Sequence, residues 1–287
     1  MSILLNVLAD LLKKGSSEKP ERASDPTERA ASLYLELLKK CLTNYIYDDD
    51  LDLMTGEVVV DPATGKYVTV KPAAVAPEQK YYGGMWPSRA HTMIGVPRLN
   101  NIQYCVEHVL AHGVPGDLIE TGVWRGGATI FMRGILKAHG VTDRLVWVAD
   151  SFMGLPEADR ARYPRESDIA FHRITELAVS LEEVRKNFER YDLLDGQIRF
   201  LKGWFKDTLP VAPIHRLAVM RLDGDMYEST IDGLVNLYPK LSPGGFVIID
   251  DYNAVESCNN AVHDFRKDAG VIAELSLIPG AGAFWMK

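Results

Sequence analysis

From residue 97 onward, short apolar runs alternate with longer stretches in which apolar residues recur at helical spacing. The short runs predict buried strands, and they fall at Asp117–Thr121, Arg144–Asp150, Ile198–Gly203, Leu217–Asp223 and Gly245–Asp250. The longer stretches predict helices over Pro97–His112, Ala128–His139, Ser180–Phe188, the stretch after Asp223 up to Leu241, and 256–269. This alternation predicts an α/β domain with a parallel sheet that is covered by helices on both faces.

The pattern is less regular at the two ends of the chain. Two short final strands, Glu274–Pro279 and Ala283–Met286, are expected as a hairpin at the sheet edge. An amphipathic helix is predicted over Glu28–Leu42. Residues 48–52 are mostly aspartate and predict a solvated acidic turn, while 56–60 and 67–70 predict a β-hairpin or an extended arm.

The first 14 residues carry apolar side chains at helical spacing, at Leu4, Leu5, Leu8, Leu11 and Leu12. They predict a small amphipathic helix that docks on the protein or on a second subunit. A secretory signal is disfavoured because no basic residues precede the apolar run and Asp10 interrupts it. The run is also too short to span a bilayer. Residues 15–27 are polar and contain prolines, and they predict a linker.

A glycine-rich turn follows the first predicted strand, in the sequence Asp117-Leu-Ile-Glu-Thr-Gly-Val-Trp-Arg-Gly-Gly. A strand, a glycine loop and a helix form a common site for a nucleotide-like cofactor at the carboxyl edge of a parallel sheet. The glycine spacing is neither the G-x-G-x-x-G of a dinucleotide fold nor a Walker loop, which disfavours a dehydrogenase. Glu120, before the glycine, suits a cofactor with an ammonium group, such as S-adenosylmethionine (SAM). The alternative is that the glycines only let strand and helix pack closely.

Acidic residues close four of the predicted strands, at Glu120, Asp150, Asp223, and the pair Asp250-Asp251. Because the carboxyl ends of parallel strands meet at one edge, these side chains are expected to share a ligand crevice. Asp150 lies one helix-plus-strand unit after Glu120, where a carboxylate can accept hydrogen bonds from an adenosine ribose. The alternative role for Asp150 is to cap its own turn.

The second group of acids predicts a cation site. Asp223, Asp250 and Asp251 offer oxygen ligands with no His or Cys nearby in sequence, which favours Mg²⁺ or Mn²⁺ over zinc. Adjacent carboxylates repel each other unless a cation or a shared proton compensates. The alternative is a hydrogen-bonded, buried Asp250 beside a solvated Asp251.

Composition narrows the classes of function. The 287 residues carry a net charge of −7 and no basic cluster, which argues against nucleic acid or an anionic membrane as the main partner. Cys41, Cys105 and Cys258 are scattered and odd in number, so neither a disulfide framework nor a zinc site is expected. A reducing cytoplasm is the expected location.

The longer motifs resemble the macrocin O-methyltransferase (TylF) family, from about Tyr34 to the C-terminus. The motifs that carry the resemblance are Arg89-Ala-His-Thr-Met-Ile-Gly-Val-Pro-Arg-Leu, Leu118-Ile-Glu-Thr-Gly-Val-Trp-Arg-Gly-Gly, Ala149-Asp-Ser-Phe-Met-Gly-Leu-Pro, Leu177-Ala-Val-Ser-Leu-Glu-Glu-Val-Arg, Leu201-Lys-Gly-Trp-Phe-Lys-Asp-Thr-Leu-Pro, Arg221-Leu-Asp-Gly-Asp-Met-Tyr-Glu-Ser-Thr and Val247-Ile-Ile-Asp-Asp-Tyr. The resemblance implies SAM- and Mg²⁺-dependent (or Mn²⁺-dependent) methylation of a sugar hydroxyl on a small-molecule natural product of the macrolide or aminocoumarin type.

The resemblance also implies an architecture. It is a class I SAM-dependent methyltransferase fold, with a mostly parallel seven-stranded sheet and an antiparallel C-terminal strand. An N-terminal helical lid, assigned to residues 1–90, would cover a SAM-binding domain at 91–287, and the protein would be a homodimer.

Site residues follow from the motifs and the resemblance together. The metal positions are Asp223, Asp250 and Asp251. Cofactor binding is assigned to Thr92, Met93, Glu120, Thr121, Gly122, Trp124, Arg125, Gly126, Asp150, Ser151, Ser180, Gly203 and Trp204. Ser180 also fits a capping box with Glu183, and Trp204 fits either adenine stacking or a core position.

A carboxylate would accept the proton of the acceptor hydroxyl, with Asp223 as first choice and Asp225 as second. Asp225 also fits a helix N-cap. Tyr227 and Ser229 would contact the acceptor or merely lie in the first turn of that helix. His91, His172 and His263 are alternative bases, although lone histidines are more often structural, and the loop 152–171 is a candidate for closure over the site. Two rival functions stay open: a cation-dependent methyltransferase for catechols or phenols, and a non-catalytic cofactor-binding protein.

Overall fold

The computed structural model describes residues 25–47, 49–166 and 168–287. The predicted helix in the first 14 residues lies outside this part of the chain, as does most of the linker predicted at 15–27. Within the described ranges, none of the helices is both long enough and apolar enough to span a bilayer. Cys41, Cys105 and Cys258 are free thiols, as expected.

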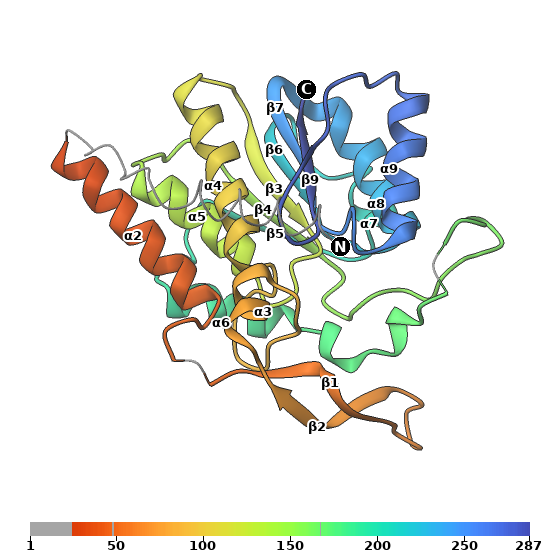
Figure 1. Ribbon diagram of the computed structural model, residues 1–287. Helices are drawn as coiled ribbons and strands as arrows, with labels where there is room; N and C mark the ends of the chain where they lie inside the picture. The colour runs from red at the N-terminus through yellow and green to blue at the C-terminus, as the bar shows by residue number, and fades with distance from the viewer. Residues whose placement is uncertain (1–24, 48, 167) are drawn as a thin grey trace, which may run out of the picture.

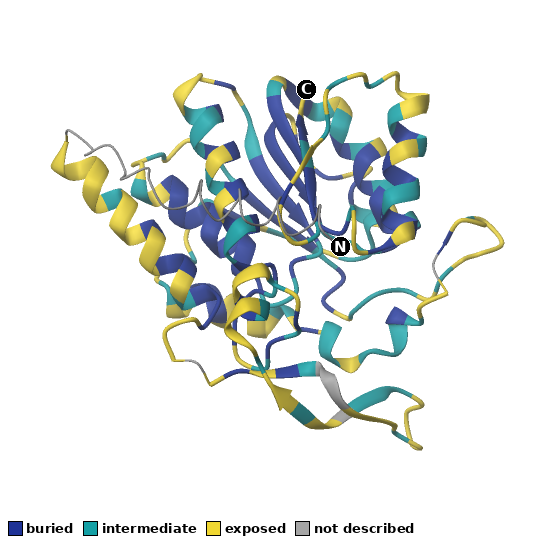
Figure 2. Ribbon diagram, viewed as in Figure 1, coloured by how far each residue is buried: buried dark blue, intermediate teal, exposed yellow. Residues whose placement is uncertain are grey.

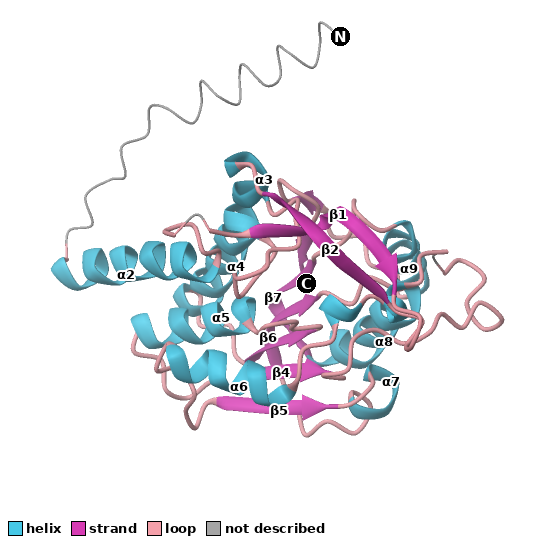
Figure 3. Cartoon of the chain, turned by 90° about the horizontal axis from the view of Figure 1, so that it is seen from below, coloured by secondary structure: helices cyan, strands magenta, loops and turns pink. Residues whose placement is uncertain are grey.

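In the described part of the chain, seven strands form the central sheet, in the order β5-β4-β3-β6-β7-β9-β8. Figures 1 and 3 show the sheet with most of its strands labelled. The strands are β3 (Asp117–Thr121), β4 (Val146–Asp150), β5 (Ile198–Lys202), β6 (Leu217–Leu222), β7 (Leu241–Ile249), β8 (Ser276–Leu277) and β9 (Ala283–Met286). β3 to β7 are parallel, and β9 is antiparallel to both of its neighbours. The predicted sheet, with its antiparallel C-terminal strand, is therefore confirmed.

Helices cover both faces of the sheet because alternate strand residues face opposite sides. Val148 and Val219 pack into a core with α4 (Gly95–Ala111), α5 (Gly127–Ala138) and α6 (Leu181–Arg190). Their neighbours Trp147 and Met220 pack into a second core with α8 (Tyr227–Leu237) and α9 (Glu256–Asp268). Figure 2 shows the strands buried between these layers. The short helix α7 (Phe205–Thr208) and the 3-10 turn at Tyr238–Lys240 complete the second layer.

The N-terminal region surrounds one edge of this core. Helix α2 (Pro26–Leu42) begins at the N-cap Asp25 and packs against α5 (Figure 1). The strands β1 (Leu51–Val60) and β2 (Tyr67–Ala74) pair as an antiparallel hairpin. Of the two predicted alternatives, a β-hairpin or an extended arm, the hairpin is therefore confirmed. Helix α3 (Pro77–Tyr82) then leads into α4. The division of the chain at residue 90 stays a prediction.

The solvated acidic turn predicted at 48–52 is wrong for two of its residues. Asp50 and Asp52 are buried, whereas Asp49 is exposed. The Asp50 carboxylate accepts hydrogen bonds from the amides of Arg89 and Ala90, and Asp52 accepts one from the amide of Trp86. These amides are distant in sequence, so the local pattern at 48–52 does not predict them. Their hydrogen bonds hold residues 86–90, which lead to α4, against Asp50 and Asp52.

Candidate active site

A cavity of about 660 Å³ opens at the carboxyl edge of the parallel strands. Its floor is formed by residues that follow β3, β4, β5, β6 and β7. Its walls include residues 82–86 and 92–94, and apolar residues between 154 and 177. We call the whole segment 82–94 the roof segment. The cavity is thus located where the topology of an open parallel sheet places a ligand crevice.

Most of the predicted cofactor and metal residues line this cavity. Those that do are Thr92, Met93, Glu120, Gly122, Trp124, Asp150, Ser151, Gly203, Trp204, Asp223, Asp250 and Asp251, together with Asp225 and Ser229. They come from segments up to 159 residues apart in sequence, which the fold brings to a single edge.

Five predicted site residues do not line the cavity: Thr121, Arg125, Gly126, Ser180 and Tyr227. Arg125 donates to the carbonyl oxygens of Pro87 and Ala90, at 2.9 Å each. Gly126 is the N-cap of α5 with φ of +87°. Ser180 is the N-cap of α6, and its hydroxyl accepts from the amide of Glu183. Arg125 therefore holds the roof segment, and Gly126 starts α5, without either residue lining the cavity.

The glycine loop approaches neighbouring backbone too closely for any side chain. A Cβ on Gly122 would collide with the carbonyl oxygen of Asp223, and one on Gly127 with the carbonyl of His91. Gly122 also has φ of +83°, a conformation that other residues rarely adopt. The glycines therefore do allow the close packing that the sequence offered as an alternative, and Gly122 lines the cavity as well.

Asp150 holds the two loops that follow β3 and β4. Its carboxylate accepts from the amide of Val123 at 2.8 Å and from that of Phe152 at 2.7 Å. Burial raises its pKa, although these amides oppose the shift. The turn-capping role is thus present, and the Ser151 hydroxyl is a further donor to Oδ1 at 3.5 Å.

Three carboxylates meet beside the glycine loop. One oxygen from each of Asp223, Asp225 and Asp251 lies within 4.8 Å of the others. Asp251 Oδ2 is buried and has no hydrogen-bond partner among the residues that the structure describes. Burial, and then the neighbouring carboxylates, raise the pKa of Asp225 to about 8 and that of Asp251 well above its usual value. An orphaned oxygen in an all-oxygen cluster, whose carboxylates would ionise more readily beside a positive charge, fits a hard divalent cation.

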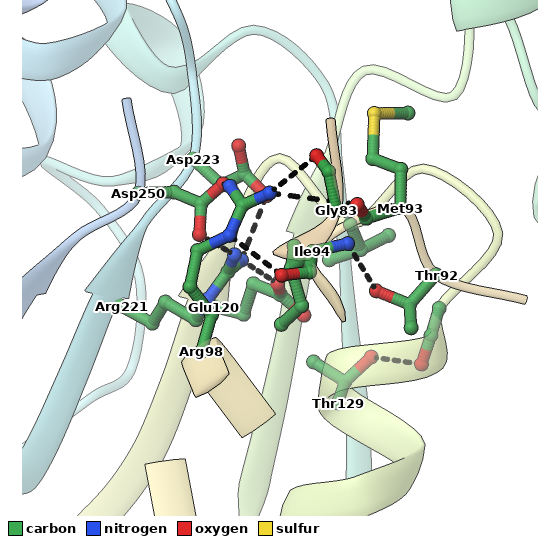
Figure 4. A network of polar contacts seen from close by, with 12 residues as sticks. Gly83, Thr92, Met93, Ile94, Arg98, Glu120, Thr129, Arg221, Asp223 and Asp250 are labelled. Carbon is green, nitrogen blue, oxygen red and sulfur yellow. Dashed lines mark hydrogen bonds and ion pairs between the residues drawn. The ribbon is translucent and has the colours of Figure 1, made fainter. Parts of the chain in front are cut away.

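Asp250, the remaining predicted metal residue, lies between two arginines (Figure 4). Arg98 donates to its Oδ2 and Arg221 to its Oδ1. The Arg221 guanidinium also pairs with Glu120, and it donates to Asp223 Oδ2 at 2.7 Å. Sequence reasoning gave neither arginine a role. The available signal was Arg221 itself, a cation inside an apolar strand, because such a residue is almost never fully buried without partners.

Asp225 is not the N-cap of α8, so that alternative is wrong. The N-cap is Met226, and Asp225 has φ of +58°. The carboxylate of Glu166 accepts instead from the amides of Tyr227 and Glu228, at 3.1 and 3.2 Å. Tyr227 is turned away from the cavity, and its hydroxyl donates to Asp264 at 2.9 Å. This arrangement leaves the Asp225 side chain to line the cavity.

The three histidines considered as bases do not line the cavity. His91 Nδ1 lies 2.7 Å from the Tyr191 hydroxyl, and His263 Nε2 lies 2.9 Å from that of Tyr252. His172 lies in the 3-10 turn Phe171–Arg173. The acids of the cavity are therefore better placed than these imidazoles to accept a proton from a bound ligand.

His91 should make the fold sensitive to acid. Burial, assisted by Arg190 and Arg125, lowers its pKa from 6.5 to about 4. The unfolded chain then binds a proton that the folded chain refuses, so this contribution to stability is complete above pH 6.5 and is lost as the pH falls toward 4. We expect the free energy of unfolding to decrease less between about pH 7.5 and 5 in His91→Gln than in wild type. Urea titrations at both pH values measure this difference, and equal decreases would contradict it.

The charge balance of the cavity favours cationic ligands. Within the described part of the chain, nine acids line it: Glu120, Asp150, Glu157, Asp223, Asp225, Glu228, Asp232, Asp250 and Asp251. Against these stand Arg98 and Lys206 in the lining, and Arg221 behind it. An excess of negative charge in a partly enclosed cleft concentrates cations, and SAM carries both a sulfonium and an ammonium group.

The sequence pattern of the Macrocin-O-methyltransferase (TylF) family matches residues 31–287. The chain belongs to this family. It is 57% identical to the 8-demethyl-8-(2,3-dimethoxy-alpha-L-rhamnosyl)-tetracenomycin-C 4'-O-methyltransferase of Streptomyces olivaceus, over 90% of this chain and 94% of that one. It is 50% identical to the Mycinamicin III 3''-O-methyltransferase of Micromonospora griseorubida, over 89% and 96% of the two chains.

Solved structures agree with the family. The O-methyltransferase NovP is 51% identical, has a TM-score of 0.79, and is matched over 90% of this chain and 99% of that chain. A calicheamicin methyltransferase, 20% identical with a TM-score of 0.51 over 94% and 98% of the two chains, shows the same fold. The predicted class I methyltransferase fold and the predicted methyltransferase activity are confirmed, and the fold implies SAM as the methyl donor.

Proposed function

We propose that this methyltransferase transfers the methyl group of SAM to a sugar hydroxyl of a glycosylated natural product, with a divalent cation bound by the aspartate cluster. The observation that carries the cation is the meeting of Asp223, Asp225 and Asp251 around the orphaned Asp251 Oδ2. The sugar is supported by the name of one relative, which specifies a rhamnosyl group.

The two ends of the cavity suit the two substrates. Gly122, Asp150 and Trp204 follow β3, β4 and β5, so the methyl donor is expected over this side of the sheet. Val255 and Ala281 line the cavity on the side of β7 and β9, and Met85 and Trp86 of the roof segment line it as well. We expect the acceptor there. The carboxylate cluster follows β6 and β7, between these two ends.

The chemical need is to activate a weakly acidic hydroxyl. A bound Mg²⁺ or Mn²⁺, held by Asp223 and Asp251 with Asp225 or Asp250, would supply Lewis acidity that lowers the pKa of the acceptor hydroxyl. Of the two predicted bases, we favour Asp225, because Arg221 holds Asp223 Oδ2 at 2.7 Å. The acids of this chain would orient the acceptor and take its proton, and the roof segment would exclude water.

A panel of acceptors tests this function. Purified protein with SAM and Mg²⁺ should methylate compounds that carry a deoxysugar with free hydroxyls at a rate at least about tenfold above catechols of similar size. Mass spectrometry locates the new methyl group. Transfer to catechols alone would favour the phenol-methylating alternative, and S-adenosylhomocysteine binding without transfer to any acceptor would favour the non-catalytic one.

We also propose that the protein is a cytoplasmic homodimer. Leu33 and Leu37, one helical turn apart on α2, are 64% and 55% exposed and give this helix an apolar outer face. Light scattering coupled to gel filtration tests the dimer, and a monomeric mass at micromolar concentration would contradict it.

A further inference from the structure

Arg98 joins the roof segment to the floor of the cavity. It lies in the first turns of α4, and its side chain is 7% exposed. Its Nε donates to the carbonyl of Ile94 at 2.7 Å, and its Nη2 donates to the carbonyls of Gly83 at 3.0 Å and Met93 at 3.4 Å. Its Nη1 donates to the carboxylate of Asp250. One guanidinium therefore contacts both ends of the roof segment and the end of β7 (Figure 4).

The two ends of the roof segment cross each other at backbone distance. Gly83 and Gly95 have φ of +73° and +69°. A Cβ on Gly83 would collide with the backbone of Met93 and Ile94, and one on Gly95 would collide with the backbone of Gly83 and Tyr81. Because of this crossing, the carbonyls of Gly83 and Met93 both lie within reach of Arg98 Nη2. The placement of these two carbonyls therefore depends on the hydrogen bonds that Arg98 donates.

Asp250 continues the connection on its other side. Its second oxygen accepts from Arg221, and Arg221 in turn pairs with Glu120 and Asp223. Arg98, Asp250 and Arg221 thus form a buried chain of charge-assisted hydrogen bonds from the roof segment to the ends of β3 and β6. Such bonds are stronger and more directional than neutral ones.

We propose that Arg98 is a positioning residue, which fixes the roof segment over the methyl donor by anchoring it to Asp250. Thr92 and Met93 line the cavity from this segment. The segment also contacts the glycine loop, because the Gly127 amide donates to the carbonyl of His91. A roof released from Asp250 would leave these residues unfixed and weaken cofactor binding. This anchoring role rests on the SAM site of the proposed function, and it does not depend on whether a cation binds.

Lysine at position 98 should not replace arginine. Its single ammonium can neutralise Asp250, but it lacks the planar fork that reaches Asp250 and the roof carbonyls together. The chain offers a matched control in Arg133, which is equally buried, at 6% exposure, and pairs with Asp195 through Nε and Nη2. Arg133 does not line the cavity.

Hydrogen exchange and calorimetry on Arg98→Lys, Asp250→Asn and Arg133→Lys test the proposal. We expect the amides of 83–94 to exchange at least about tenfold faster in the first two variants than in Arg133→Lys, relative to the core amides of the same protein. We expect the Kd for S-adenosylhomocysteine, measured without added metal, to rise at least about fivefold in Arg98→Lys. Asp250→Asn removes the carboxylate to which Arg98 is anchored, and it tests the proposal if Arg98→Lys does not fold.

Two results would overturn the proposal. The first is that Arg98→Lys matches the control, with the exchange rates of the amides of 83–94 and the Kd for S-adenosylhomocysteine both within about twofold of the Arg133→Lys values. The other is faster exchange in Arg98→Lys with unchanged exchange in Asp250→Asn, because the anchor would then not be Asp250. Absence of methyl transfer with every acceptor would affect the proposed function and leave these measurements standing.

Discussion

Replacing Asp223 with asparagine is expected to lower methyl transfer by about 10²-fold, because the proposed cation loses a carboxylate ligand, while S-adenosylhomocysteine still binds. Asp223 follows β6 and contributes a carboxylate oxygen to the cluster with Asp225 and Asp251. The substitution removes one negative charge with little change in shape, and Arg221 keeps its pairs with Glu120 and Asp250. The loss should therefore appear in activity rather than in folding.

Asp195→Asn is the matched control for this prediction. Asp195 also accepts hydrogen bonds from a buried arginine, Arg133, but it lies away from the cavity. Its replacement should leave the rate within about twofold of wild type. Initial rates, together with calorimetric binding of S-adenosylhomocysteine, distinguish the two variants. Full activity in Asp223→Asn would remove this residue from the chemistry.

Removal of divalent cations is the second change with a large expected effect. After dialysis against EDTA the rate should fall at least about 10²-fold, because the acceptor hydroxyl then loses Lewis-acid activation. Mg²⁺ or Mn²⁺ should restore the rate, since both prefer the oxygen ligands that this cluster offers. S-adenosylhomocysteine should bind to the dialysed protein, because Thr92, Asp150 and Trp204, which are predicted to bind the cofactor, are not members of the aspartate cluster.

Elemental analysis must accompany that experiment to show that the dialysed protein holds less than stoichiometric metal. An unchanged rate in such a sample would show that the aspartates act without a cation. A loss of S-adenosylhomocysteine binding in parallel with activity would instead indicate that dialysis had damaged the fold.

Several features of the site could be predicted from sequence because they depend on the order of elements alone. Acids that close parallel strands must share one edge of the sheet, so Glu120, Asp150, Asp223 and the Asp250-Asp251 pair were expected together, and they all line the cavity. The fold followed from the same alternation of strand and helix, and the family motifs identified the cofactor.

Other features depend on contacts between distant segments and were missed. Asp250 is buried and hydrogen-bonded, as one alternative had it, but its partners Arg98 and Arg221 were not foreseen, and Arg98 reaches it across 152 positions. Asp50 and Asp52 are buried because the amides of residues 86–90 return to them. Asp225 does not cap α8, because Glu166 reaches that helix end from another loop. No local pattern specifies such partners.

The central claim, that the aspartate cluster binds one divalent cation, is tested most directly by titrating Mn²⁺ into the purified protein and following its paramagnetic resonance signal. We expect wild type to bind a single Mn²⁺ per chain, and Asp251→Asn, which loses the orphaned carboxylate, to bind it at least about tenfold more weakly. Equal binding in the two proteins, or no saturable binding in wild type, would contradict the account.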